Sequence, residues 1–170
     1  MYYRFIQTPL GPMLAAGEGT FLRYLEFANE KKEGGTLKDL KKQFQLEDLT
    51  EADQPFDSVA RQLQGYFEGR VKQFDLRLAP FGTEFQRSVW NRLRGIAYGE
   101  TRTYGQIAAS LGEPSKARAV GAAVGRNPIA IIIPCHRVVG HDGGLTGYGG
   151  GLDRKAKLLA LEEENTGPGF

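Results

Sequence analysis

The single cysteine of this chain lies in a segment that can place a nucleophile. Cys135 follows the apolar residues 129–133 and Pro134, and it directly precedes His136 and Arg137. An unperturbed thiol has a pKa of about 8.5, so it needs cationic or hydrogen-bonding neighbours to ionise at neutral pH. The apolar run predicts a buried strand, which would put the thiol at a strand end. An inert buried cysteine is the alternative that the pattern alone leaves open.

His136 is the first candidate for a base that serves this thiol. Adjacent side chains on an extended segment point to opposite faces, so we expect His136 to reach the sulfur through a water. A helix is predicted to begin at Leu152, and Glu162 on it could orient His136. The alternative is that residues 162–164 form a solvated acidic helix end.

Residues 140–151 hold seven glycines between these two segments. The loop matches neither a dinucleotide fingerprint nor a phosphate loop, so no nucleotide cofactor is expected. Its backbone could approach a flat ligand closely, with Tyr148 as an aromatic face, or it could be a flexible surface hairpin.

A helix-turn-helix is predicted upstream of the cysteine. Thr103 and Gln106 form a capping box for its first helix, and Ser115 is expected to cap the second helix, residues 115–124. Arg118 is the one long side chain past the first turn of that second helix. Its outward positions are mainly small residues, namely Ala119, Gly121, Ala122 and Ala123. This pattern favours recognition of a groove by shape and backbone, although small residues also permit tight helix packing.

Composition limits the class of protein. The chain has 170 residues, of which 41% are hydrophobic and 25% charged, which excludes disorder and fibrous repeats. One cysteine and two histidines cannot form an intramolecular disulfide or a thiolate-rich zinc site, so we expect no metal. The longest strongly apolar stretch, residues 129–133, is far shorter than the roughly 20 residues of a membrane span. The amino terminus also lacks the apolar run of a signal peptide, so we expect no membrane partner and no export.

The net charge of +2 is unevenly distributed. Residues 1–81 hold 11 Lys and Arg against 12 Asp and Glu, whereas residues 82–160 hold 11 against 5. A basic half is typical of a nucleic-acid-binding module, although a scattered solvated surface gives the same count.

Two domains are predicted from the pattern of elements. The first, residues 1–75, is an α/β domain with a small antiparallel sheet, followed by a linker at residues 76–82 and a helical domain at residues 83–170. The expected strands of the first domain are residues 2–6, 13–16 and 21–27, and its helices fall near residues 37–44 and 56–67. Thr83 is expected to cap the first helix of the second domain.

These residues resemble the O6-alkylguanine-DNA alkyltransferases, or methylated-DNA:protein-cysteine methyltransferases. The resemblance covers nearly the whole chain and is weakest in residues 1–70. The matching blocks are residues 82–90, 98–105, 117–121, 127–128, 133–138 and 147–162. The Pro-Cys-His-Arg core, with an arginine-bearing helix 17 residues before the cysteine, is highly specific.

The resemblance implies a ribonuclease-H-like α/β domain followed by a winged-helix-like domain. It implies irreversible, single-turnover transfer of an alkyl group from O6-alkylguanine, and from O4-alkylthymine, in double-stranded DNA to Cys135. It also implies minor-groove binding, base flipping, no cofactor, a monomer that can bind DNA cooperatively, and a location in the cytoplasm or, in a eukaryote, the nucleus.

The resemblance implies a functional role for individual residues of this chain. Cys135 would be the alkyl acceptor and His136 its water-linked base, held by Glu162. Tyr104 would assist flipping and donate a proton to the guanine, while Arg118 would take the place of the flipped base. The other expected DNA contacts are Ala117, Ala119, Gly121, Arg126 and Asn127, of which Asn127 would tie the recognition helix to the active-site turn. The guanine pocket would be lined by Val138, Tyr148 and Gly149.

The chain departs from the family pattern at a few positions. Glu84 stands where many relatives have proline, Gly149 stands where some have serine, and the zinc ligands of some members are absent.

Two other functions are compatible with parts of the pattern. A catalytically silent alkyltransferase-like lesion-binding protein would lack the acceptor that Cys135 supplies. A winged-helix regulator with a redox-sensing thiol would explain the basic half and Cys135, but not Tyr104, Arg118 and Asn127 together.

Overall fold

Two units make up the chain in the computed structural model, which describes residues 1–28 and 35–166. Contacts between Cα atoms group Met1–Pro80 into one unit and Phe81–Phe170 into the other. Within the segment expected to be a linker, Arg77–Leu78 forms strand β5 and pairs with a strand of the first unit. The predicted boundaries at residues 75 and 83 stay a prediction.

The first unit is built on a five-stranded sheet in the order β4-β1-β2-β3-β5. Its long strands are β1 (Tyr2–Ile6), β2 (Met13–Glu18) and β3 (Phe21–Phe27), paired antiparallel as predicted. The two-residue edge strands β4 (Thr50–Glu51) and β5 run parallel to β1 and β3. The sheet is therefore mixed rather than antiparallel. Two residues cannot display an alternating pattern, so the sequence carried no signal for these edges.

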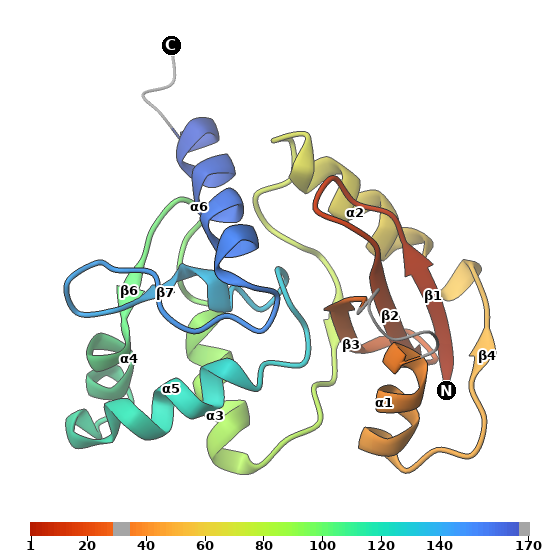
Figure 1. Ribbon diagram of the computed structural model, residues 1–170, viewed down its shortest axis with the longest axis horizontal. Coiled ribbons are helices and arrows are strands. Elements are labelled where there is room, and N and C mark those ends of the chain that lie inside the picture. The colour runs from red at the N-terminus through yellow and green to blue at the C-terminus, as the bar shows by residue number, and fades with distance from the viewer. Residues whose placement is uncertain (29–34, 167–170) are drawn as a thin grey trace. The chain divides into compact units, whose positions relative to one another are not determined.

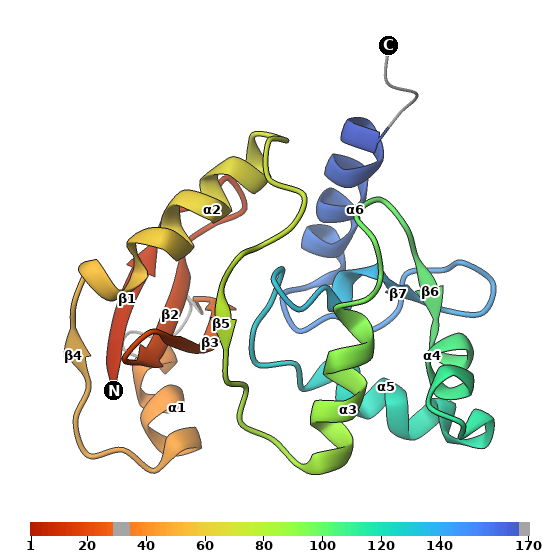
Figure 2. The same cartoon turned by 180° about the vertical axis from the view of Figure 1, so that it is seen from behind.

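Helices cover both faces of this sheet (Figures 1 and 2). Helix α1 (Gly35–Phe44) packs Leu40 against Leu14, Ala16 and Tyr24 of β2 and β3. The 3₁₀ helix η1 (Gln54–Phe56) leads into α2 (Asp57–Phe67), which buries Val59, Leu63 and Tyr66. Both helices were predicted from the spacing of apolar residues, and both predictions are confirmed.

The carboxyl group of Glu26 makes this unit sensitive to pH. Glu26 lies on β3 opposite Leu14, and burial raises its pKa from 4.5 to about 8. The folded protein therefore keeps a proton that the unfolded chain loses, so stability falls as pH rises from about 4.5 to about 8. We expect Glu26→Gln to be more stable than the unchanged protein at pH 8.5, by about 5 kcal/mol, and equal to it near pH 4.5.

Urea unfolding at the two pH values measures this effect. Glu47→Gln, at an exposed position after α1, is the control and should follow the unchanged protein at both. A Glu26→Gln variant that gains nothing at pH 8.5 would show that Glu26 is already ionised at no cost in the fold.

Two helices of the second unit begin at capping boxes. Helix α3 (Glu84–Leu93) follows Thr83, and α4 (Tyr104–Ser110) follows Thr103. In each box the threonine hydroxyl accepts from the backbone N–H three residues on, and the glutamine there accepts from the threonine N–H. The capping box predicted at Thr103 and the helix cap predicted at Thr83 are both confirmed, and Thr83 also forms a full box with Gln86.

The second helix of the predicted helix-turn-helix begins differently from the expectation. Pro114–Lys116 forms the 3₁₀ helix η2, and α5 spans Ala117–Gly125 with no side-chain cap. The predicted Ser115 cap is wrong, because Pro114 starts a helical turn before Ser115. Helix α5 contacts both α3 and α4. The indole N–H of Trp90 on α3 donates to the carbonyl of Ala123 on α5 at 2.8 Å.

A short parallel pairing joins the remaining elements. Strand β6 (Arg102–Thr103) pairs with β7 (Val138–Val139), and η3 (Cys135–Arg137) immediately precedes β7. Residues 140–151 form a loop that leads to α6 (Leu152–Thr166), and Figure 1 shows this loop projecting beyond β6 and β7. Because β6 directly precedes α4, the pairing brings the start of α4 close to the segment that carries the cysteine. None of the described helices is long and apolar enough to span a membrane.

Candidate active site

The apolar segment before the cysteine is buried but is not a strand. Residues 129–133 form turns in which the Ile132 N–H bonds to the Ala130 carbonyl and the Ile133 N–H to the Ile129 carbonyl. Ile131 has a φ of 70°, a region that a β-branched residue rarely adopts. The predicted strand is therefore wrong, since an apolar run signals burial without fixing the backbone conformation.

Asn127 holds this turn from the end of α5. Its side-chain amide donates to the Ile133 carbonyl at 2.8 Å, and its carbonyl oxygen accepts from the Ile129 N–H at 3.0 Å. The Ile133 carbonyl also accepts from the Cys135 N–H at 2.8 Å. Asn127 thus links the end of α5 to the backbone that positions Cys135.

Cys135 begins η3, and its side chain and that of His136 are both buried. His136 Nε2 lies 2.5 Å from Glu162 Oε2. Burial lowers the pKa of His136 below its usual range, although the hydrogen bond and charge of Glu162 raise it. A neutral imidazole that donates from Nε2 carries its lone pair on Nδ1. Nδ1 has no hydrogen-bond partner among the described residues, so it can accept a proton from a thiol.

Glu162 is the centre of a buried charge cluster. Its Oε1 accepts from Arg137 Nε at 2.7 Å and from the Gly99 N–H at 3.2 Å, and its Oε2 accepts from Arg137 Nη2 at 3.2 Å. Arg137 Nη1 also donates to the Ile96 carbonyl at 2.7 Å. Arg137, a candidate neighbour of the thiol in the sequence, therefore binds Glu162. The reading of Glu162 as a solvated helix end is wrong, because its side chain is 1% exposed.

Lys155 is a buried cation that the sequence reasoning missed. It lies on α6 and donates from Nζ to the carbonyls of Val138 at 2.6 Å and Thr146 at 2.8 Å. Burial lowers the pKa of Lys155, and the charge that Cys135 carries when it is ionised opposes that shift. The spacing of Lys155, Leu158 and Glu162, at i, i+3 and i+7, could have predicted that Lys155 lies on the buried face of the helix, where all three are found.

Tyr104, the first residue of α4, reaches across α5 toward the glycine-rich loop. Its ring lies over Gly121, where a Cβ atom would be 3.7 Å from Tyr104 Cδ1. Its hydroxyl donates to the Thr146 carbonyl at 3.3 Å and accepts from the Thr146 hydroxyl at 3.2 Å. The Tyr104 side chain is therefore held by α5 beneath its ring and by the loop after β7 at its hydroxyl.

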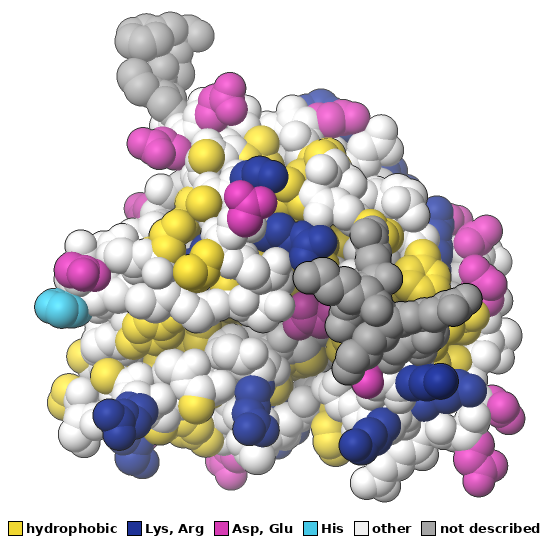
Figure 3. Space-filling view, in the orientation of Figure 1, with side chains coloured by type: hydrophobic (Ala, Val, Ile, Leu, Met, Phe, Trp, Pro, Cys, Tyr) yellow, Lys and Arg dark blue, Asp and Glu magenta, His cyan; other side chains and the backbone are white. Residues whose placement is uncertain are grey.

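The outer face of α5 carries small side chains and few long ones. Arg118, Ala119 and Arg126 are exposed, and Ala117 and Gly121 are half-buried. Ala123, predicted to face outward, is buried because α3 packs there through Trp90. Figure 3 shows Lys and Arg side chains over the surface formed by α4 and α5.

The three residues expected to line a guanine pocket lie on β7 and on the loop that follows. Val138 is fully buried, Tyr148 is half-buried and Gly149 is exposed. A Cβ atom at Gly149 would meet no atom within 4 Å, so the serine of some relatives would fit there.

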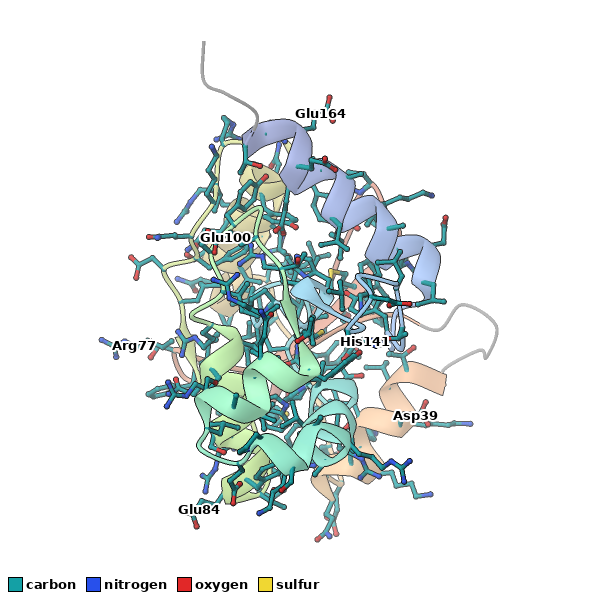
Figure 4. All side chains as sticks on the ribbon, turned by 90° about the vertical axis from the view of Figure 1, so that its left-hand side faces the viewer. Asp39, Arg77, Glu84, Glu100, His141 and Glu164 are labelled. Atoms are coloured by element: carbon teal, nitrogen blue, oxygen red, sulfur yellow. The ribbon has the colours of Figure 1, made fainter. Side chains whose placement is uncertain are left out.

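Other groups lie apart from this site. His141 is exposed on the loop after β7, and Glu84 and Glu100 point outward from the start of α3 and the turn before β6 (Figure 4). Among residues 1–28 and 35–166, no cluster of three or more His, Cys, Asp or Glu side chains could hold a metal ion.

Comparisons with known proteins show which chains this one resembles. Residues 84–164 match the family model described as "6-O-methylguanine DNA methyltransferase, DNA binding domain", and residues 1–80 match its "ribonuclease-like domain". The methylated-DNA–protein-cysteine methyltransferase of Methanosarcina barkeri is 53% identical over 168 residues, covering 97% of this chain and 99% of the relative. That of Methanosarcina acetivorans is 51% identical over 163 residues, covering 95% and 98%.

A solved structure of similar length shares the fold. The "Mycobacterium tuberculosis OGT in complex with DNA" is 44% identical with a TM-score of 0.85, covering 97% of this chain and 94% of that chain. The two-domain fold expected from the sequence is confirmed. The chain belongs to the O6-alkylguanine-DNA alkyltransferases, the family of methylated-DNA–protein-cysteine methyltransferases that repair DNA by direct reversal.

Proposed function

We propose that Cys135 accepts an alkyl group from O6-alkylguanine, and from O4-alkylthymine, in double-stranded DNA, and that each protein molecule reacts once. The observation that carries this proposal is the buried series Cys135–His136–Glu162. In this series a thiol directly precedes a histidine whose Nδ1 has no hydrogen-bond partner among the described residues and whose Nε2 is held by a carboxylate.

Alkyl transfer to Cys135 begins with the loss of the thiol proton. The thiol proton passes to His136 Nδ1 through a water, and the Lys155 ammonium stabilises the thiolate. The sulfur attacks the alkyl carbon, the bond from that carbon to the guanine oxygen breaks, and its electron pair stays with guanine. Guanine then takes a proton from the Tyr104 hydroxyl, which regains one from solvent, and His136 releases to solvent the proton that it took from the thiol. The product is a thioether, which has no carbonyl for water to attack, so Cys135 is consumed.

The lesion reaches Cys135 by base flipping from the minor groove. The small side chains of Ala117, Ala119 and Gly121 let α5 approach the DNA, and exposed Arg126 adds positive charge. Arg118 enters the stack in place of the flipped base and offsets part of the few kcal/mol that flipping costs. Val138, Tyr148 and Gly149 contact the flipped guanine. The protein acts as a monomer that can bind DNA cooperatively.

A duplex carrying O6-methylguanine with a labelled methyl group tests this function. Label should appear on the Cys135 peptide and saturate at one group per protein molecule. Repeated turnover, or label on another residue, would contradict the mechanism. Intact, unlabelled protein that still binds the lesion tightly would favour the silent lesion-binding alternative.

The role of Arg118 can be separated from the chemistry. We expect Arg118→Ala to repair duplex substrate about tenfold more slowly, since the flipped state loses the side chain that fills the gap. Reaction with free O6-benzylguanine, which needs no flipping, should be largely kept.

Arg92→Ala is the matched control for Arg118→Ala. Arg92 is an exposed arginine on α3, so this variant should repair duplex at the normal rate. Equal losses on duplex and free base in Arg118→Ala would show that Arg118 supports the fold rather than flipping.

A further inference from the structure

The hydroxyl of Thr146 donates a hydrogen bond to the hydroxyl of Tyr104, which is distant in the sequence. Thr146 lies in the loop after β7, 42 residues from Tyr104, and is exposed. An exposed threonine hydroxyl can bond to water in any rotamer, yet this one donates to the phenol oxygen at 3.2 Å. The phenol in turn donates to the Thr146 carbonyl at 3.3 Å.

The position of Thr146 is set by a buried group rather than by the loop alone. Its carbonyl also accepts from Lys155 Nζ at 2.8 Å, and Lys155 binds the Val138 carbonyl, three residues after Cys135. Tyr104 is fixed from the other side by the start of α4 and by Gly121 beneath its ring. A continuous set of hydrogen bonds therefore joins Tyr104 through Thr146 and Lys155 to the cysteine segment.

We propose that Thr146 is a positioning residue of the transfer reaction, whose hydroxyl holds the phenol of Tyr104 in place and stabilises it when it loses its proton. This inference rests on the proposed function, in which Tyr104 protonates the departing guanine. When the alkyl carbon–oxygen bond breaks, the Tyr104 O–H turns from the Thr146 carbonyl to guanine and transfers its proton there, so that negative charge develops on the phenol oxygen. The Thr146 hydroxyl still donates to that oxygen, and a hydrogen bond to an ionised acceptor is roughly twice as strong as a neutral one.

Substitution at Thr146 separates this role from packing. Thr146→Val keeps the shape of the side chain and removes the donor, whereas Thr146→Ser keeps the donor and removes a methyl group. We expect the single-turnover rate at saturating duplex to fall about tenfold in Thr146→Val, which equals about 1.4 kcal/mol. The Kd for duplex should stay within about twofold, and Thr146→Ser should restore the rate to within about twofold.

A double-mutant cycle with Tyr104 tests the partner. In a Tyr104→Phe background the phenol oxygen is absent, so adding Thr146→Val should lower the rate by less than about twofold. Thr101→Val, at an exposed threonine before β6, is the matched control and should leave the rate unchanged. A full tenfold loss in the Phe background, equal losses in the Val and Ser variants, or no loss in Thr146→Val would each overturn the proposal.

The ¹³Cζ resonance of Tyr104 gives a readout that is independent of transfer. It should shift in Thr146→Val and return in Thr146→Ser, because it reports hydrogen bonding at the phenol oxygen. A shift in a protein that transfers no alkyl group would refute the proposed function while leaving the contact established. Transfer with neither a shift nor a rate change would refute the role of Thr146 alone.

Discussion

Replacing Cys135 with alanine is expected to abolish alkyl transfer while leaving lesion binding intact. The proposed mechanism uses a thiol as the acceptor, and Cys135 is the one cysteine of the chain and directly precedes the histidine that Glu162 holds. The substitution removes one sulfur atom from a buried site, a change that costs about 1 kcal/mol in stability. Labelled-methyl transfer from duplex DNA and gel-shift titration with the same duplex measure the two effects.

The unchanged protein after complete methylation is the natural control for this variant. Both lack a nucleophile and should transfer nothing, but the methylated protein should bind lesion-containing duplex more weakly, because its S-methyl group takes the space that the alkyl group of a second lesion needs. Residual transfer in Cys135→Ala would mean that another side chain is the acceptor. Loss of lesion binding together with transfer would mean that the variant is misfolded or that Cys135 itself binds the lesion.

Substituting Glu162 with glutamine should have the largest combined effect on stability and rate. It removes the only carboxylate within hydrogen-bonding distance of buried Arg137 in the described part of the chain, and an uncompensated buried charge costs about 3 to 5 kcal/mol. It also removes the carboxylate that orients His136, so the transfer rate should fall by at least about a hundredfold. Chemical denaturation and single-turnover transfer at saturating duplex measure the two losses.

The next residue of α6 provides the matched control. Glu163 is exposed, so Glu163→Gln should change neither stability nor rate. Adding Arg137→Gln to Glu162→Gln should recover part of the lost stability, since no lone charge remains, but not the rate, because His136 still lacks its carboxylate. A normal rate in Glu162→Gln would show that the carboxylate serves the fold only.

Local patterns were enough to predict most of the helices. Thr83 and Thr103 each stand three residues before a glutamine, and each box starts its helix as expected, because capping uses atoms within one turn of the chain. The three long strands of the first unit were likewise predicted from short apolar runs separated by turn residues. The prediction failed for β4 and β5, because two-residue strands are defined by their partners.

The residue types that can react are evident from the amino-acid order alone: one cysteine, a histidine directly after it, and a basic half with an arginine on a small-residue helix. Neighbours along the chain reveal these residue types without any knowledge of the fold. The contacts that they make depend on the tertiary structure. In the fold, Arg137 binds Glu162, Lys155 is buried and donates to backbone carbonyls, and Thr146 bonds to Tyr104, 42 residues away in the chain. Hydrogen bonds between such distant residues depend on how β6, β7 and α6 pack, and no local propensity encodes that packing.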